Sequence, residues 1–238
     1  MKREPDRVSV SGERLLSAVE RLVDDPDILI AQVEAFIEDV TARRQVGERT
    51  RLPLQTIAER LIRRFSNRSA FAGGVTALPS LLPGGGTAVA LIGGSLADMT
   101  MMMKYEVELA LSLTHLYGYD IREERGRWLA YTLAAVNTYD VSSGRNFFVD
   151  MAEAQLEAVS KYTPRQLSKL VVTAFGKYVL FSASRSLIRV LPFVGIVVSA
   201  SANKLIVGSV GWRCVDALDR LRTAEGNDPG SVVDAHVL

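Results

Sequence analysis

One acidic side chain has the sequence position of a functional group. Asp98 follows a run from residue 69 to residue 97 that contains no charged side chain. A carboxylate on such an apolar segment needs a cation or a ligand, because burying it alone is costly. Lys204, Arg185 and Arg189 are the cations that a second apolar segment offers. We interpret Asp98 as one half of an ion pair or an exposed charge, with a ligand or proton site as the alternative.

His115, Tyr117 and Asp120 form a second group near the expected end of the same helix. A histidine there commonly caps backbone carbonyls or lies at the surface. The alternative is that these side chains, with Asp98 and Lys204, belong to a ligand or ion-pair site. No H-x-x-x-H or C-x-x-C spacing occurs, so the sequence predicts no metal site.

Two glycine-rich stretches come close to catalytic or phosphate-binding motifs without matching them. Residues 93–97 lack the last glycine of the G-x-S-x-G motif, and no strand-to-helix turn is expected there. Residues 83–87 lack the lysine and the spacing of a phosphate-binding loop. The sequence therefore predicts no catalytic residue and no cofactor.

Arginines gather immediately before the uncharged run. Residues 41–68 contain eight arginines and two glutamates, a local excess of six positive charges. Basic residues beside an apolar segment attract anionic membrane surfaces, and a solvated helix face is the alternative. The residues predicted to contact membrane or lipid are Arg60, Arg63, Arg64, Arg68, Leu78, Leu81, Leu82, Leu91 and Met102.

The uncharged run is long enough to span a bilayer, but prolines and glycines interrupt it. We therefore expect a short helix over 69–81, a break at Pro83, and a long helix over 86–117. Small residues recur every four positions after the break and again over 195–211, and this spacing lets helix backbones approach closely. We expect these two segments to pack on each other or on another copy of the chain. The packing positions are Gly86, Ala90, Gly94, Gly195, Ser199 and Asn203.

The composition is that of a folded chain. Of its 238 residues 48% are hydrophobic and the net charge is +1, which argues against intrinsic disorder and nucleic-acid binding. Cys214 is the single cysteine, so no intrachain disulfide forms. The charged N-terminus has no apolar stretch behind it. These features favour a cytoplasmic protein, and the membrane-binding interpretation makes it peripheral to the inner membrane.

Helical periodicity dominates the chain, and no strand pattern is evident. The sequence predicts an all-α, multi-helix bundle with two glycine-rich apolar regions, 70–103 and 187–212, at its centre. Amphipathic helices over 1–51 precede a helical domain over 52–222 and a disordered tail over 223–238. The other expected helices cover about 12–24, 26–40, 53–67, 121–141, 146–161, 164–190 and 195–222. Gly118 is the expected terminator of the long helix; Asp120 with Glu123, and Thr163 with Gln166, are the expected capping pairs.

The order of these motifs resembles the EcsC family of bacterial proteins. A glycine-rich stretch is followed by LADMTMMMKYEVELALSLTHLYGYD and, far downstream, by LPFVGIVVSASANKLIVGSVGW. The resemblance covers residues 60–220, with a departure at Met99-Thr100. The matching positions are Gly73, Gly74, Asp98, Tyr117, Gly118, Tyr119, Asp120, Pro192, Gly195 and Asn203. The resemblance implies a bacterial, membrane-associated helical protein whose family name is linked to transport and secretion, and it brings no catalytic residue.

The sequence thus favours a non-catalytic protein that binds the cytoplasmic membrane face or lipid acyl chains, in support of transport, secretion or envelope homeostasis. Its expected partners are membrane lipid or an apolar helix, with a homo-oligomer as one form of the latter, and no nucleic acid. The first alternative is a soluble scaffold that oligomerises through its apolar helices. A less favoured alternative is a lipid-directed hydrolase using Asp98 and His115.

Overall fold

The computed structural model describes residues 4–42, 53–76, 88–144, 162–186 and 195–226. Side chains are not described at 71–98 and 183–202. These parts of the chain form helices, and no strand occurs among them, which confirms the predicted all-α bundle. The helices are α1 Glu4–Glu20, α2 Pro26–Ala42, α3 Leu54–Thr76, α4 Ala88–Leu116, α5 Glu124–Ser143, α8 Pro164–Ser186 and α9 Gly195–Ala224.

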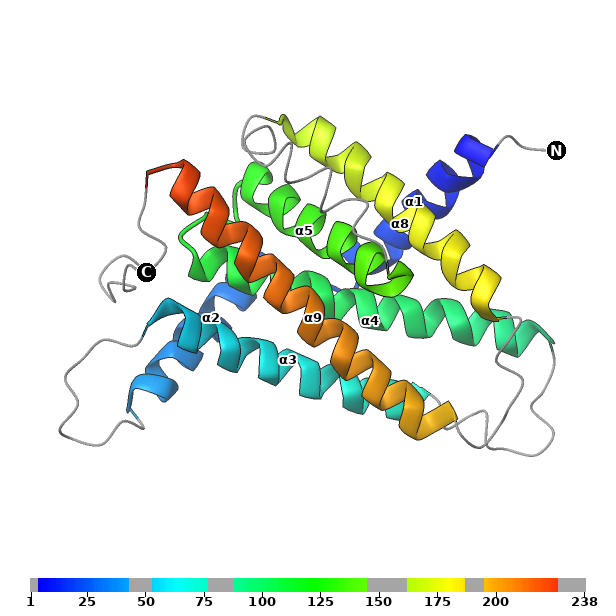
Figure 1. The fold of residues 1–238 in the computed structure, drawn as a ribbon, viewed down its shortest axis with the longest axis horizontal. Helices are drawn as coiled ribbons and strands as arrows, with labels where there is room; N and C mark the ends of the chain where they lie inside the picture. Colours follow the sequence, from blue (N-terminus) through cyan, green and yellow to red (C-terminus); the bar gives the residue numbers. More distant parts are fainter. Residues whose placement is uncertain (1–3, 43–52, 77–87, 145–161, 187–194, 227–238) are drawn as a thin grey trace.

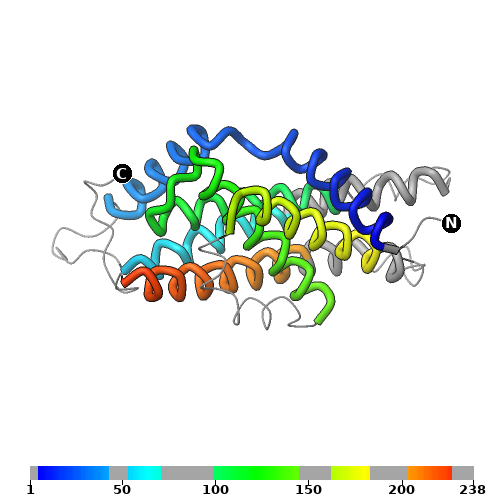
Figure 2. Tube along the Cα trace, turned by 90° about the horizontal axis from the view of Figure 1, so that it is seen from above, coloured from blue at the N-terminus to red at the C-terminus, as the bar shows by residue number. Residues whose placement is uncertain are grey.

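Helix α4 lies in the middle of the bundle and contacts α1, α2, α3, α5 and α9 (Figure 1). Helices α1 and α2 lie along one edge of the molecule and α9 along the opposite edge (Figure 2). The most extensive pairings join α3 to α9 and α1 to α8. Every residue from Glu106 to Tyr117 is buried, as expected of a helix surrounded by others.

Apolar residues at helical spacing form the inward face of α3. Leu54, Ile57, Ala58, Leu61, Ile62 and Phe65 are all at most 3% exposed. The predicted break between residues 67 and 69 is wrong, because α3 continues as one helix to Thr76. Ser69 is itself buried within it, and the first proline after it is Pro79. Nothing in the sequence at 68–69 removes a backbone donor, so the helix has no reason to stop there.

Two glycines allow α1 and α8 to cross in backbone contact. A Cβ atom on Gly12 would lie 1.9 Å from the carbonyl oxygen of Val172, and one on Gly176 would lie 2.0 Å from that of Val8. Only glycine fits at such distances. The predicted helix start at Gly12 is wrong for this reason: α1 begins at Glu4, and Gly12 is a packing position in its interior.

Helix α4 ends at Gly118 as predicted, but the turn that follows provides no side-chain cap for α5. Gly118 has a φ of 90°, its amide donates to the carbonyl of His115, and the Tyr119 amide donates to that of Thr114. This pattern is a Schellman helix end. The predicted capping box is wrong, because α5 starts at Glu124 after Glu123 with no side-chain cap. Asp120 instead accepts the Arg122 amide at 2.8 Å.

The Thr163–Gln166 pair at the start of α8 is confirmed in one half of the predicted box. The Gln166 side-chain oxygen accepts the Thr163 amide at 2.9 Å. Gly144 also ends α5 in the left-handed region, with a φ of 66°, between the predicted helices over 121–141 and 146–161.

Several predictions fall on residues outside the described ranges. These are the break at Pro83, Leu78, Leu81, Leu82, Gly86, the helix over 146–161 and most of the tail. The division of the chain into three regions stays a prediction; α1 and α2 pack directly on α4. Among the described helices, none combines the length and apolar composition that crossing a membrane requires.

Candidate functional site

Helix α4 carries two buried carboxylates, Glu106 and Glu108. Glu106 has no solvent exposure and Glu108 is 3% exposed. Successive residues of an α-helix turn by about 100°, so side chains two positions apart leave it on nearly opposite sides. The two acids consequently meet different neighbours within the same core.

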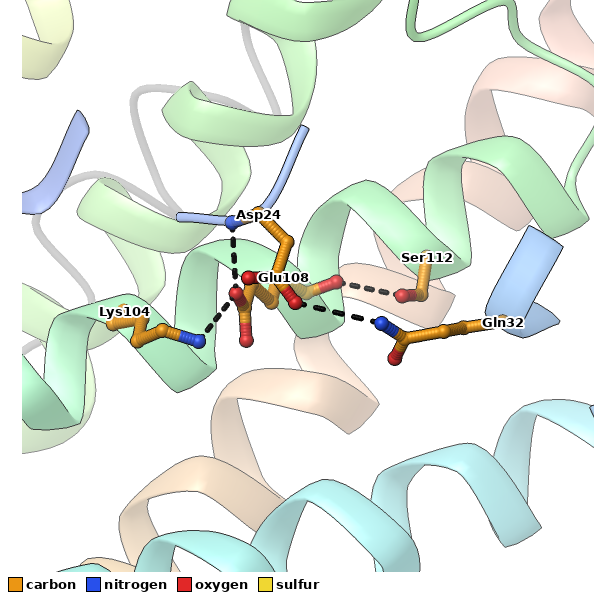
Figure 3. A network of polar contacts seen from close by, with 5 residues as sticks. All are labelled: Asp24, Gln32, Lys104, Glu108 and Ser112. Atoms are coloured by element: carbon orange, nitrogen blue, oxygen red, sulfur yellow. Dashed lines mark hydrogen bonds and ion pairs between the residues drawn. The ribbon is translucent and has the colours of Figure 1, made fainter. Parts of the chain in front are cut away.

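Glu108 lies in a network that joins α4 to the connection between α1 and α2 (Figure 3). Its Oε1 accepts a hydrogen bond from Lys104 Nζ at 2.5 Å and another from the Asp24 amide at 3.0 Å. The Asp24 carboxylate in turn accepts Gln32 Nε2 at 3.4 Å, and Ser112 Oγ donates to the Glu108 carbonyl at 2.7 Å. Because its charge is matched by a lysine and an amide, Glu108 has the contacts of a structural ion pair.

Glu106 has no such compensation. Its Oε2 lies 2.6 Å from Thr138 Oγ1 on α5, and its Oε1 is buried with no hydrogen-bond partner among the described residues. Burial raises the pKa of Glu106 to about 8, and the contact with Thr138 opposes that rise only in part. The carboxyl is therefore largely protonated at neutral pH.

The geometry of Thr138 supports a protonated Glu106. Thr138 Oγ1 also lies 2.8 Å from the carbonyl oxygen of Ala134. A hydroxyl has one proton to donate. In the neutral acid both contacts are satisfied when Thr138 donates to Ala134 and Glu106 donates its own proton to Thr138. In the ionised acid Thr138 donates to the carboxylate instead, and this contact with the charged form lowers the pKa of Glu106.

Cys214 on α9 completes this part of the core. Asn137 Nδ2 donates to its Sγ at 3.7 Å, and burial raises the pKa of the thiol to about 12. A thiol so far from ionisation is not a nucleophile at neutral pH. We call Glu106, Asn137, Thr138 and Cys214 the core acid cluster; it joins α4, α5 and α9.

The predicted group around His115 serves the turn after α4. His115 is buried and its Nε2 has no partner; burial is the main cause that lowers its pKa. Burial also raises the pKa of Tyr117, and the Asp219 carboxylate on α9 raises it further. Tyr119 donates to Glu225 at 3.2 Å, and Arg122 donates to Asp27 on α2 at 2.6 Å. These contacts fasten the turn to α9 and α2.

Asp98 and His115 do not meet in one pocket. Both lie on α4, and 17 positions along a helix correspond to about 25 Å. Lys204 is exposed on α9, and its predicted pairing with Asp98 stays a prediction, since the Asp98 side chain is not described. The hydrolase alternative requires Asp98 and His115 to lie in one pocket, and their separation along α4 argues against it.

The arginine face is present as the sequence predicts. Arg60, Arg63 and Arg68 are exposed and Arg64 is half-buried. Arg63 pairs with Glu59 at 3.6 Å, with 72% of the arginine side chain exposed. Arg64 lies over the Phe36 ring at 5.3 Å, and Arg68 lies over Phe65 at 5.7 Å. We call these four arginines the arginine face of α3.

The described small residues of α9 pack on α3 and α4. A Cβ atom on Gly208 would lie 3.5 Å from Ser66 Oγ, and one on Gly211 would lie 2.8 Å from Ile62 and 2.9 Å from Leu109. Asn203 is buried. Packing of this segment on residues 86–97 stays a prediction, and so do the roles of Ala90, Gly94, Gly195 and Ser199. The same holds for Leu91, because the side chains at 71–98 are not described.

Sequence reasoning misplaced one residue and missed two. Met102, predicted to contact lipid, is 5% exposed and packs in the core. Glu106 and Glu108 were detectable by the argument applied to Asp98, because both lie in the apolar stretch 105–113.

Within the described residues, no His, Cys, Asp and Glu side chains gather in a group that could hold a metal ion. Comparisons of this chain with protein-family models, with curated proteins and with solved structures find no match.

Proposed function

We propose that this protein binds an anionic membrane surface through the arginine face of α3, as a non-catalytic peripheral protein on the cytoplasmic side. The observation that carries the proposal is the continuity of α3. One helix, Leu54–Thr76, holds the exposed arginines and the first turns of the uncharged run. Exposed arginines and the start of the uncharged sequence therefore lie on the same helix.

The chemistry of the arginines suits lipid phosphates. A guanidinium presents a planar fork of donors that matches a phosphate group. Among the described residues, Glu59 pairs with Arg63 through an exposed contact of 3.6 Å, and Asp39 interacts electrostatically with Arg64. Exposed pairs of this kind are worth little, so Arg63 exchanges its partner at small cost.

The arginine face should bind an anionic membrane with moderate affinity. A basic residue near an anionic surface contributes about 1 kcal/mol. Four such residues would together strengthen binding by roughly two to three orders of magnitude at low salt. Binding of this size is reversible and weakens as salt screens the charges.

Flotation with lipid vesicles tests the proposal. The purified chain should float with vesicles containing phosphatidylglycerol and much less with pure phosphatidylcholine. The triple variant Arg60→Gln, Arg63→Gln, Arg68→Gln should bind about 100-fold more weakly. A matched control, Arg7→Gln, Arg14→Gln, Arg165→Gln, removes three exposed arginines from α1 and α8 and should bind nearly as the parent does.

Equal losses in the two triple variants would contradict the proposal, since net charge rather than the arginine face would then govern binding. A parent chain that ignores anionic vesicles and has the mass of an oligomer by light scattering would favour the scaffold alternative. The resemblance to the EcsC family stays a prediction, and with it the support of transport, secretion or envelope homeostasis.

A further inference from the structure

Helix α9 exposes two large apolar side chains in one row. Leu205 is 71% exposed and Trp212 is 44% exposed. Gly208 lies three positions after Leu205 and four before Trp212, and residues at these spacings share a helix face. The opposite face of α9, with Val207, Val210 and Cys214, is buried in the core. The two exposed side chains therefore lie on a helix whose opposite face is packed in the core.

Helix α9 packs along α3, and the contacts between them set how this row lines up with the arginines along the helix axes. Gly208 faces Ser66 and Gly211 faces Ile62, so the two helices run antiparallel, in agreement with Figure 1. This register brings Trp212 level with Arg63 and its neighbours. It brings Leu205 level with Ser69, where the uncharged run begins.

We propose that Leu205 and Trp212 insert into the boundary between headgroups and acyl chains of an anionic bilayer, while the arginine face of α3 binds the phosphates. This inference rests on the proposed function and names the apolar half of the same surface. Tryptophan suits the position, because its ring is apolar and its N–H finds partners at the membrane–water interface. Arginine side chains beside it select an anionic bilayer.

The surroundings limit the depth of insertion. Glu59 and the exposed Asp216 lie toward the C-terminal end of the row. Carboxylates are repelled by anionic headgroups, so they mark the edge of the lipid-facing area. Only side chains enter the bilayer; the helix backbones stay at its surface.

A second copy of the chain is the weaker candidate for this surface. A specific interface buries about 800 Å² on each partner, and two side chains with cationic neighbours supply only a fraction of that area. Two copies meeting here would also bring their arginine faces together. Charge complementarity therefore points to an anionic partner.

Tryptophan fluorescence separates insertion from charge attraction. The chain has two tryptophans, so Trp128→Phe leaves Trp212 as the only reporter. Trp128 is half-buried and Phe keeps its apolar ring. With phosphatidylglycerol vesicles, Trp212 emission should shift to the blue. Lipids brominated near the headgroup end of the acyl chain should quench it more than lipids brominated near the chain terminus.

Binding variants give the second measurement. Leu205→Ser with Trp212→Ser should weaken vesicle binding about tenfold and leave its salt dependence unchanged. The matched control is Leu22→Ser with Ile28→Ser, which removes two apolar side chains of comparable exposure, 41% and 52%, from another surface. This control should bind as the parent does.

The outcomes distinguish the two proposals. Salt-sensitive binding without a fluorescence change or quenching overturns the insertion and leaves the arginine proposal intact. No binding of the parent to anionic vesicles overturns both. A dimer that Leu205→Ser with Trp212→Ser dissociates, measured by light scattering without vesicles, also overturns the insertion in favour of self-association.

Discussion

Glu106 and Glu108 are separated by one residue on α4, yet they solve the burial of a carboxylate in opposite ways. Glu108 pairs with Lys104 and accepts a hydrogen bond from the Asp24 amide. Glu106 meets one hydroxyl, leaves one oxygen without a partner and holds a proton at neutral pH. Helix geometry alone decides this difference, because it aims the two side chains at different parts of the fold.

Of these two acids, Glu106 is the one that makes the free energy of unfolding depend on pH. A carboxylate matched by a lysine belongs to the fixed framework of the bundle. A neutral buried acid remains compatible with the core only while it is protonated. Glu106 is therefore a core group through which stability responds to rising pH, whereas the network of Figure 3 is a framework of hydrogen bonds and one ion pair.

The largest effect should come from the ionisation of Glu106. Its pKa is raised from an ordinary value of 4.5 to about 8. The folded state holds this proton more tightly than the unfolded state does. The contribution of Glu106 to the free energy of unfolding is therefore fully present below pH 4.5 and is lost as the pH rises through 8. The loss is on the order of 4 kcal/mol of unfolding free energy. Urea unfolding of the parent and of Glu106→Gln between pH 4.5 and 9 measures it.

Glu106→Gln supplies the contrast, because its amide has no proton to lose. The difference in unfolding free energy between variant and parent should rise steadily in favour of the variant over that range. Other titrating groups are common to both proteins and cancel in the difference. A difference independent of pH would mean that Glu106 is charged in the folded protein.

The ion pair of Glu108 should give the next largest effect. Glu108→Leu leaves Lys104 without its carboxylate and the Asp24 amide without its acceptor. Breaking a buried pair costs about 3–5 kcal/mol. We expect about 3 kcal/mol in urea unfolding, because the Lys104 side chain is 18% exposed and regains some water.

The double variant Lys104→Met, Glu108→Leu is the control for charge. It should recover part of the loss, because replacing both members of a buried pair by apolar groups is often nearly neutral. A double variant less stable than Glu108→Leu alone would show that the amide of Asp24, not the lysine, makes Glu108 necessary.

Local pattern made much of the fold predictable. The inward residues of α3, the left-handed end at Gly118 and the Thr163–Gln166 contact each depend on residues within a few positions. The arginine face follows from the same periodicity. The start of α1 was missed because the fit of Gly12 against Val172 depends on a helix 160 positions away.

The two glutamates show where sequence reasoning ends. Their positions among apolar residues signal that each needs a partner, but not which one. Thr138 is 32 positions from Glu106, and Asp24 is 84 positions from Glu108. The exposure of Leu205 and Trp212 was hidden for the same reason, since apolar residues at helical spacing usually face the core.

The smallest effect should come from Thr138, the neighbour that contacts the Glu106 carboxyl. Thr138→Val keeps the shape of the side chain and removes the hydroxyl between Glu106 and the Ala134 carbonyl. The contact with Thr138 lowers the pKa of Glu106, so its removal should move the pH at which stability is lost above 8. The variant should also be about 1 kcal/mol less stable at pH 7, the usual worth of one hydrogen bond.

Thr132→Val is the matched control on the same helix. The buried hydroxyl of Thr132 donates to the Trp128 carbonyl at 2.7 Å and contacts no carboxyl group among the described residues. It should lose similar stability without any shift along the pH axis. If both variants gave the same pH profile as the parent, Thr138 would not stabilise the ionised form of Glu106, and the raised pKa of Glu106 would depend on burial alone.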